Sequence, residues 1–430
     1  MLMAGCGWET HKETTMSDKR RVVITGLGAV SAYGFGEDVI WNNMIAGKTA
    51  ISTIKHLDTS ELRTTVGSIV DREALQEALR ELKMRYTDLT VDSAIFAADQ
   101  ALKQAGLISG LPPYEPQEIA TLIGTGIGST ETYHAAVQSY IDKGVRGVRP
   151  TTVPRCMANA VCSQMAIRYR LTGPNYVMTS ACTSSTTAIG VGFRMIKDGY
   201  IDKALCGGAD TIFDPFTMIA WDRLGVMSKK SDPITCSRPF DSDRDGCVIG
   251  EGAATLVLES LESARARGAH IRAEICGFGE SSDAKHITAP DPEGQAKSIT
   301  AALKSADISA PDVGYINAHG TATKANDPSE CSAVKLALGS AADCIPMASV
   351  KSYFGHLLGG SGAIETIATV LTLENKMIPA NLNLDTPDPQ CGTNLVHSSG
   401  PIPLERPVAL KNSFGFGGNN GVLVLRRWEK

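Results

Sequence analysis

The chain has 430 residues and a formal net charge of −5; 43% of the residues are hydrophobic and 20% are charged. These values are typical of a globular enzyme and argue against a general affinity for nucleic acid. No apolar run approaches the ~18 residues that a membrane-spanning helix needs. The 11 cysteines are odd in number and form no CxxC pair. We therefore expect a reduced, cytoplasmic protein rather than a disulfide framework or a zinc site.

The N-terminal end begins with a polar, irregular stretch. Residues 1–15 contain no apolar core of a secretory signal, and we expect a disordered extension with no part in the chemistry. Residues 22–25 then predict a buried strand that breaks at Gly26 and Gly28. A dinucleotide-binding fingerprint would need a third glycine where this chain has Ser31, so the strand gives little support to a nucleotide site.

Hydrophobic periodicity predicts alternating helices and strands along the following part of the chain. Helices are expected over residues 41–46, 92–106 and 159–170, and strands over residues 119–123 and 203–208. In the second of these helices, alanines at helical spacing form an apolar face with Leu102. This alternation predicts an α/β protein with mixed or largely parallel sheets covered by helices.

One stretch has the features of a turn that carries a nucleophile. Residues 175–185 begin apolar and β-prone, narrow to small residues around Cys182, and continue as a helix-compatible run to Lys197. A strand, a tight turn and a helix would place Cys182 at or near a helix N-terminus, where the helix dipole lowers a thiol pKa from its usual ~8.5. The alternative is a small buried apolar residue, as most free cysteines are.

The order of the elements recurs in the second part of the chain. Residues 97–109 (AADQALKQAGLIS) precede one expected strand, and residues 298–309 (SITAALKSADIS) precede another. The turn at Cys182 has a partner after residues 347–351. We interpret this as an internal duplication of a strand-and-helix unit, with chance similarity of generic units as the alternative. Two such halves packed together would form one layered α/β body with the site between them.

The second half supplies candidate catalytic side chains at strand ends. His319 follows the strand that ends near residue 316, where ligands of open α/β sheets gather, and its small neighbours predict an exposed imidazole. Lys351 and His356 lie in one glycine-rich turn, and Glu365 follows in the next helix. A histidine hydrogen-bonded in a turn and a solvated lysine are the alternatives.

A further glycine-rich turn lies near the C-terminus. Residues 412–421 (NSFGFGGNNG) precede a final strand at residues 422–425. Such a turn lets backbone N–H groups approach a ligand oxygen, as an oxyanion hole requires, and a plain β-turn is the alternative. A thiolate with imidazole donors and this turn suits acyl transfer. Neither a metal enzyme nor a hydrolase is indicated.

The motifs around these residues resemble those of the β-ketoacyl-acyl-carrier-protein synthases of the thiolase superfamily, most closely the elongating type II condensing enzymes. The resemblance runs from about Arg21 to the C-terminus. Its motifs are SAC at Cys182, RPFDSDRDG at 238–246, GEGA at 250–253, SSDA at 281–284, NAHGTAT at 317–323, VKSYFGHLLGGSGAIE at 350–365 and NSFGFGG at 412–418. It implies a thiolase-like α/β fold of two duplicated halves, each a mixed sheet with helices, which we place at residues 16–268 and 269–430.

The resemblance also implies an activity: extension of an acyl chain by two carbons in fatty acid or polyketide biosynthesis, without a cofactor or a metal. Cys182 would hold the acyl chain as a thioester while malonyl-acyl carrier protein loses carbon dioxide to give the attacking carbanion. His319 and His356 match the histidines of decarboxylation and enolate stabilisation. Phe416 matches an oxyanion-hole amide and a gate for the second substrate.

Five further residues match supporting positions of the family. Lys351 matches a lysine that orders the histidine network, and Glu365 an acid of the same network. Thr321 and Thr323 match threonines that bind the pantetheine arm. Ile127 falls where the family lines its acyl pocket.

The partners that the resemblance implies are acyl carrier protein and a second subunit. That subunit, identical or homologous, would pair through the sheet near the nucleophile strand. Arg223 and neighbouring bases are expected to face the acidic carrier protein. A thiolase would need a second cysteine in the C-terminal turn, and an initiating synthase would have asparagine in place of His356. A scaffold subunit such as a chain-length factor, which typically lacks the nucleophile, is the alternative from another class.

Three positions depart from the family pattern. Thr187 stands where many elongating enzymes have histidine, Asn419 where the family usually has threonine, and Lys285 where it has tyrosine. None of these changes removes a named catalytic group. They favour the hypothesis of a specialised pathway, for a polyketide, a polyene or a modified acyl chain, and Thr187 is the first position to examine.

Overall fold

Each half of the chain builds one part of a large mixed sheet. The computed structural model describes residues 20–84 and 87–429, and the extension predicted for residues 1–15 lies outside them. The N-terminal half supplies β1 (Val22–Ser31), β5 (Ala120–Gly124), β6 (Asn175–Met178), β7 (Lys203–Asp210) and β8 (Gly252–Ser260). The C-terminal half supplies β9 (Ala273–Ser282), β10 (Val313–Asn317), β11 (Met347–Ala348), β14 (Val408–Gly415) and β15 (Asn419–Arg427).

The two halves repeat one strand order. The sheet runs β11-β10-β14-β15-β9-β1-β8-β7-β5-β6, so β1-β8-β7-β5-β6 corresponds to β9-β15-β14-β10-β11. In each half the pairs nearest the middle of the sheet are antiparallel and the outer pairs are parallel. The halves join where β1 pairs with β9, with Val22 opposite Ile275. The predicted duplication is confirmed. The boundary predicted between residues 268 and 269 falls between α9 (Leu261–Ala266) and β9, and its position stays a prediction.

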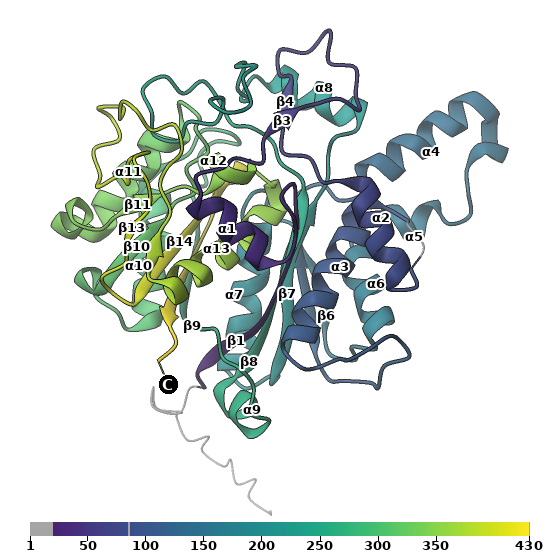
Figure 1. Cartoon of the computed structure of the whole chain (residues 1–430), viewed down its shortest axis with the longest axis horizontal. Coiled ribbons are helices and arrows are strands. Elements are labelled where there is room, and N and C mark those ends of the chain that lie inside the picture. Colours follow the sequence, from purple (N-terminus) through teal and green to yellow (C-terminus); the bar gives the residue numbers. More distant parts are fainter. Residues whose placement is uncertain (1–19, 85–86, 430) are drawn as a thin grey trace, which may run out of the picture.

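The helices form three layers against the two half-sheets (Figure 1). One outer layer consists of α2 (Arg72–Glu81), α3 (Leu89–Gln104) and α6 (Ala160–Tyr169), and the other of α10 (Pro292–Ala306) and α11 (Asn326–Leu338). The central layer, with buried residues from both half-sheets, contains α7 (Ser184–Lys197) and α13 (Ser361–Asn375). This arrangement confirms the predicted layered α/β fold.

Shorter elements surround these layers. Among the described residues, the remaining α-helices are α1 (Glu37–Ile45), α4 (Thr130–Lys143), α5 (Thr152–Cys156), α8 (Pro215–Leu224) and α12 (Lys351–Phe354). The short strands are β2 (Gly34–Phe35), β3 (Ser52–Thr53), β4 (Val66–Gly67), β12 (Met377–Ile378) and β13 (Ile402–Pro403). Within residues 20–84 and 87–429, no helix is both long enough and apolar enough to cross a membrane.

Two glycines let α7 fit between the half-sheets. A Cβ at Gly190 would lie 2.4 Å from the ring of Phe278 on β9, and a Cβ at Gly192 would lie 2.4 Å from Sγ of Cys206 on β7. Close-packed interiors leave no room for such overlaps. The helix α7, which follows Cys182 in the chain, is therefore packed closely against strands of both halves.

Some helices and strands begin or end at other residues than the sequence predicts. The helix predicted over residues 92–106 begins earlier, at Leu89, because the Asp88 carboxylate caps it by accepting from the backbone N–H groups of Thr90 and Val91. In the partner of the Cys182 turn, residues 347–351, the strand is the short β11 and α12 begins at Lys351.

Candidate active site

Cys182 lies on a tight turn between β6 and α7. Ala181 has a φ of 53°, in the left-handed region that side chains disfavour. The Ser184 hydroxyl donates to the carbonyl of Ala181 at 2.6 Å and accepts from the backbone N–H of Ser180 at 2.9 Å. These bonds hold the strained turn, and the cysteine is only 7% exposed.

The thiol of Cys182 ionises less readily than the sequence suggests. Burial raises the pKa of Cys182 to about 11, although the Lys351 ammonium and the backbone N–H of Phe416 act in the opposite direction. The predicted lowering by a helix N-terminus is therefore wrong in sign. The first residue of α7 is Ser184, and burial is the largest influence on the pKa of Cys182.

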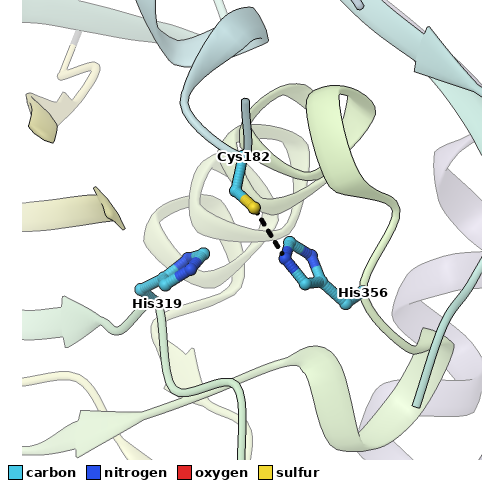
Figure 2. Close-up of side chains that lie close together, drawn as sticks. All are labelled: Cys182, His319 and His356. Carbon is cyan, nitrogen blue, oxygen red and sulfur yellow. Dashed lines mark hydrogen bonds between the residues drawn. The ribbon is translucent and has the colours of Figure 1, made fainter. Parts of the chain in front are cut away.

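Two histidines of the C-terminal half meet Cys182 at one buried cavity (Figure 2). Nε2 of His356 lies 3.1 Å from Sγ of Cys182, and the rings of His319 and His356 approach edge-on with centroids 5.4 Å apart. His319 is 2% exposed, so the exposed imidazole predicted there is wrong. Phe414 of β14 packs against its ring.

Both imidazoles are neutral at pH 7 because of their surroundings. Burial, then the ammonium groups of Lys351 and Lys411, hold the pKa values of His319 and His356 well below the ordinary value. Nζ of Lys351 lies 3.2 Å from Nδ1 of His319. A protonated lysine can only donate, so Nδ1 accepts and the proton of the neutral ring is on Nε2. Nδ1 of His356 lies 2.8 Å from the hydroxyl of Ser361.

A buried carboxylate that sequence reasoning missed holds the His319 loop. Glu330 of α11 accepts from the backbone N–H groups of His319 and Gly320, both at 2.8 Å, and from Nδ2 of Asn412 at 3.0 Å. Nothing in the local sequence distinguishes Glu330 from a surface glutamate of a helix.

A second missed residue, Lys411, is fully buried on β14. Its Nζ lies 2.9 Å from Oε2 of Glu365, while Lys351 donates to Oε1 of the same carboxylate. The Glu365 carboxylate therefore lies between the ammonium groups of Lys351 and Lys411. The available signal was a lysine within the otherwise apolar run that precedes Asn412.

We expect Lys411→Met to be more stable than the wild type at pH 7, because Glu365 keeps its ion pair with Lys351 when the second buried ammonium group is removed. Burial lowers the pKa of Lys411 from 10.5 to about 8, so below pH 8 the native state holds a poorly solvated charge. Between pH 8 and 10.5 the unfolded chain keeps a proton that the native state has lost, so wild-type stability rises and the difference shrinks. Urea unfolding at pH 7 and pH 10 measures this. Exposed Lys48→Met is the control, and a variant less stable than wild type at pH 7 contradicts the prediction.

The threonines predicted to bind substrate line the same cavity. The hydroxyls of Thr321 and Thr323 lie 2.9 Å apart. The guanidinium of Arg244, itself 1% exposed, donates to the carbonyl of Thr323 at 3.0 Å and to Asp388 at 2.6 Å. Arg244 therefore fixes the backbone that carries both hydroxyls.

The predicted gate, Phe416, is half-buried and lines the cavity of Cys182. Its ring stacks on Trp221 of α8, with centroids 6.2 Å apart and planes 16° from parallel. Nδ2 of Asn419, one of the departures from the family pattern, donates to the carbonyl of Phe416 at 3.0 Å. Trp221, which sequence reasoning missed, contacts both this cavity and the next.

Ile127 does not reach the cavity of Cys182. It is 49% exposed and lines a separate, largely apolar cavity of about 810 Å³ with Trp221 and Phe216, whereas the cavity at Cys182 is about 100 Å³. Asp210 positions the Ile127 loop by accepting from backbone N–H groups of Gly126 at 2.7 Å and Gly359 at 2.6 Å. That buried carboxylate ties together loops from both halves.

The other singled-out positions do not line the cavity of Cys182. The Thr187 hydroxyl lies 3.1 Å from that of Ser180, and Thr187 lines neither cavity. Lys285 is exposed and paired with Asp291 at 2.8 Å. Arg223 is exposed on α8, the helix of Trp221.

The cluster of Cys182, His319 and His356 has the composition of a metal site, with possible ligand atoms within 4.8 Å of one another. Its electrostatics oppose a cation. Nζ of Lys351 lies 3.2 Å from Nδ1 of His319, so a cation bound at this ring would face an ammonium group. The same positive environment suits an anion that develops on a substrate.

Comparison with known proteins agrees with this geometry. Family models for the β-ketoacyl synthase N-terminal and C-terminal domains match residues 19–264 and 272–385. The chain belongs to the β-ketoacyl synthase family. It is 39% identical to 3-oxoacyl-[acyl-carrier-protein] synthase 2 of Synechocystis sp. over 96% of this chain and 99% of that protein.

Solved β-ketoacyl synthases share the fold along nearly the whole chain. The ishigamide ketosynthase/chain length factor is 32% identical with a TM-score of 0.87, and covers 96% of this chain and 100% of that one. A type II polyketide ketosynthase in complex with its acyl carrier protein is 29% identical with the same TM-score and coverage. The predicted family resemblance is thus confirmed.

Proposed function

We propose that this β-ketoacyl synthase condenses an acyl chain held on Cys182 with malonyl-acyl carrier protein, extending the chain by two carbons. The observation that carries the proposal is the meeting of Sγ of Cys182, the imidazoles of His319 and His356 and the N–H of Phe416 at one buried cavity. The curated relative named above carries the matching activity in its name.

The chemistry proceeds in two half-reactions. Sγ of Cys182 attacks the acyl thioester of the carrier protein, and the pantetheine thiolate leaves with the cysteine proton. Malonyl-carrier protein then loses carbon dioxide, and the electrons of the broken C–C bond form an enolate whose oxygen accepts N–H bonds from His319 and His356. The enolate carbon attacks the carbonyl carbon of the acyl chain. The carbonyl oxygen then accepts hydrogen bonds from the backbone N–H groups of Cys182 and Phe416. The C–S bond to Cys182 breaks, and the thiolate takes a proton from solvent.

The surrounding residues hold the two substrates. Thr321 and Thr323 bind the pantetheine arm, because their hydroxyls line the cavity of Cys182. The acyl chain extends past Trp221 into the apolar cavity lined by Ile127. Arg223, exposed on α8, faces the acidic carrier protein.

A second subunit pairs with the edge of the sheet. Among the residues that the structure describes, the outermost strand of the N-terminal half, β6, pairs on one side only, and Tyr176 on it is 51% exposed. Exposed apolar side chains continue over α4, α5 and α6 at Val137, Val153 and Ile167. An unpaired sheet edge beside exposed apolar side chains is typical of a surface that binds another protein chain. The solved ketosynthase/chain length factor makes a homologous partner an alternative to a second copy. The reduced cysteines, none of which forms a disulfide within the described residues, support a cytoplasmic location.

Mass spectrometry of the purified protein tests the assignment of Cys182. Incubation with acyl-carrier protein is expected to add one acyl mass to the wild type and none to Cys182→Ala. Cys247→Ala, a buried cysteine that also lines the cavity, is the matched control and should still be acylated.

No adduct on the wild type, or an adduct that survives Cys182→Ala, would favour a scaffold subunit over an enzyme. Carrier proteins primed with saturated, unsaturated and aromatic chains extend the assay to the pathway. Equal extension of all primers would sink the hypothesis of a specialised pathway.

A further inference from the structure

The cavity of Cys182 contains a buried amide that the condensation mechanism above does not use. Gln295, in the first turn of α10, lines this cavity and is fully buried. Its Oε1 accepts from the hydroxyl of Ser329 on α11 at 2.9 Å. Among the described residues, its Nε2 has no hydrogen-bond partner. Buried donors without an acceptor are rare in native proteins, so this nitrogen calls for a partner in the cavity.

The other amide side chains that line the cavity donate to protein acceptors. Nδ2 of Asn326 donates to the carboxylate of the next residue at 3.2 Å, and Nδ2 of Asn420 donates to Oδ1 of Asp283 at 2.7 Å. Asp283, the acidic residue of the lining, also accepts from the backbone N–H of Asp291 on Oδ2 at 3.0 Å. Both oxygens of Asp283 therefore already have donors, and Gln295 is left to donate to a group that enters the cavity.

The chemistry of the second substrate indicates which group this is. The NH₂ of an amide can only donate, so its partner is an oxygen acceptor. In the function proposed above, the thioester carbonyl becomes the enolate oxygen that His319 and His356 bind, and Thr321 and Thr323 bind the pantetheine arm. The malonyl carboxylate is the acceptor that has no donor among these residues.

The start of α11 makes the same cavity suitable for an anion. Ala325 and Asn326 line the cavity, and Ala325 gives the helix no side-chain cap. The N-terminus of a helix carries a partial positive charge. Asp327 of the same turn does not line the cavity, and its carboxylate accepts from the backbone N–H of Phe240 at 2.8 Å. The cavity wall next to α10 thus offers an uncharged donor and the positive end of a helix dipole.

We propose that Gln295 binds the malonyl carboxylate through Nε2 and orients it for the loss of carbon dioxide. This inference rests on the condensing function proposed above. When the C–C bond breaks, its electrons remain on the enolate and the carboxylate leaves as neutral carbon dioxide, which Gln295 binds only weakly. Interactions that are stronger in the ground state than in the transition state slow a step. An uncharged amide therefore holds this group at less cost to the rate than a lysine or arginine would.

A comparison of two carrier-protein ligands tests the contact with the carboxylate. Malonyl-carrier protein and acetyl-carrier protein differ by the carboxylate alone. Their binding is measured on protein with Cys182→Ala and His319→Ala, which cannot be acylated and releases carbon dioxide slowly. Adding Gln295→Met should weaken malonyl-carrier protein about tenfold, within the range for a hydrogen bond to a charged group, and leave acetyl-carrier protein unchanged. Equal weakening of both ligands would place Gln295 on the pantetheine arm and overturn the proposal.

Carbon dioxide release by protein that keeps Cys182 and His319 provides a second measurement. Gln295→Met should raise the KM for malonyl-carrier protein about tenfold, while acylation of Cys182 keeps its rate. Gln295→Glu preserves the size and the acceptor for Ser329 but sets a carboxylate against the malonyl carboxylate, so its loss should exceed that of Gln295→Met. The matched control is Gln390→Met, at an exposed glutamine outside the cavity lining.

The two Gln295 variants also separate a structural role from substrate binding. If Gln295→Glu kept wild-type kinetics while Gln295→Met lost activity, the bond to Ser329 would be the function of Gln295 and the proposal would be wrong. Unchanged kinetics in both variants beside an active wild type would also refute it, with the condensing function intact. Absence of carbon dioxide release by the wild type would refute the condensing function itself, and this inference with it.

Discussion

His319→Ala is expected to lower the rate of malonyl-carrier protein decarboxylation about 100- to 1,000-fold while Cys182 is still acylated. His319 offers Nε2–H to the enolate oxygen, because Lys351 occupies its Nδ1, and removal of one such donor typically costs this factor. The ring beside Sγ of Cys182 is that of His356, 3.1 Å away, so acyl transfer to the sulfur keeps its neighbour. Carbon dioxide release and protein mass measure the two half-reactions separately.

An exposed histidine far from the cavity provides the control for this experiment. His270 lies in the linker before β9, and His270→Ala should leave both half-reactions unchanged. If His319→Ala blocked acylation as strongly as decarboxylation, His319 would instead support the turn of Cys182. The division of labour between the histidines would then be wrong.

Arg244→Met is expected to destabilise the protein by about 3–5 kcal/mol, the range for removal of one partner from a buried ion pair. Its guanidinium is 1% exposed, and its contacts include Asp388, the carbonyl of Thr323 and, at 3.6 Å, the fully buried Asp327. Methionine fills part of the space but leaves these acceptors without the cation. Urea unfolding measures the decrease in the free energy of unfolding. The control is Arg80→Met, which removes one partner of the exposed ion pair between Arg80 and Glu77. It should lower the free energy of unfolding by less than about 0.5 kcal/mol.

The loss in Arg244→Met should also depend on pH. Burial raises the pKa of Asp327 from 3.8 to about 6 although Arg244 opposes that shift, so without the arginine the pKa rises further. A raised carboxyl pKa means that stability falls as pH rises from about 4 through the native pKa. The deficit should therefore be larger at pH 8 than at pH 5. A pH-independent deficit would mean that lost packing, not the charge on Asp327, dominates.

The sequence was sufficient for the fold and for the groups nearest the sulfur. Cys182, His319 and His356 stand in short motifs at strand ends; each motif alone left a structural alternative open, and their combination matched the motifs of one family. The repeated order of elements predicted the two matching half-sheets because each element is recognisable from the local hydrophobic periodicity of the sequence.

Groups that act through distant partners could not be predicted. Lys411 meets Thr186 across 225 positions of sequence, and its neighbours are defined only once α7 and β14 pack together. The shift in the pKa of Cys182 was predicted with the wrong sign because a helix end is visible in a sequence and the burial of a side chain by distant parts of the chain is not. Ile127 was assigned by position alone, and only the structure places it in the cavity beyond Trp221.

The pairing of α7 with α13 bears on how such a site arises. Their first turns touch: a Cβ at Gly362 would lie 2.2 Å from Oγ1 of Thr186, and the backbone N–H of Ala363 donates to Ser185 at 2.9 Å. The two helices occupy equivalent places in the two copies of the repeated unit. A polypeptide of half this length could create the same meeting of helix ends only with a sister molecule, and would then present identical residues from both sides. Within one chain the copies are free to diverge, so one contributes the thiol and the other the imidazoles.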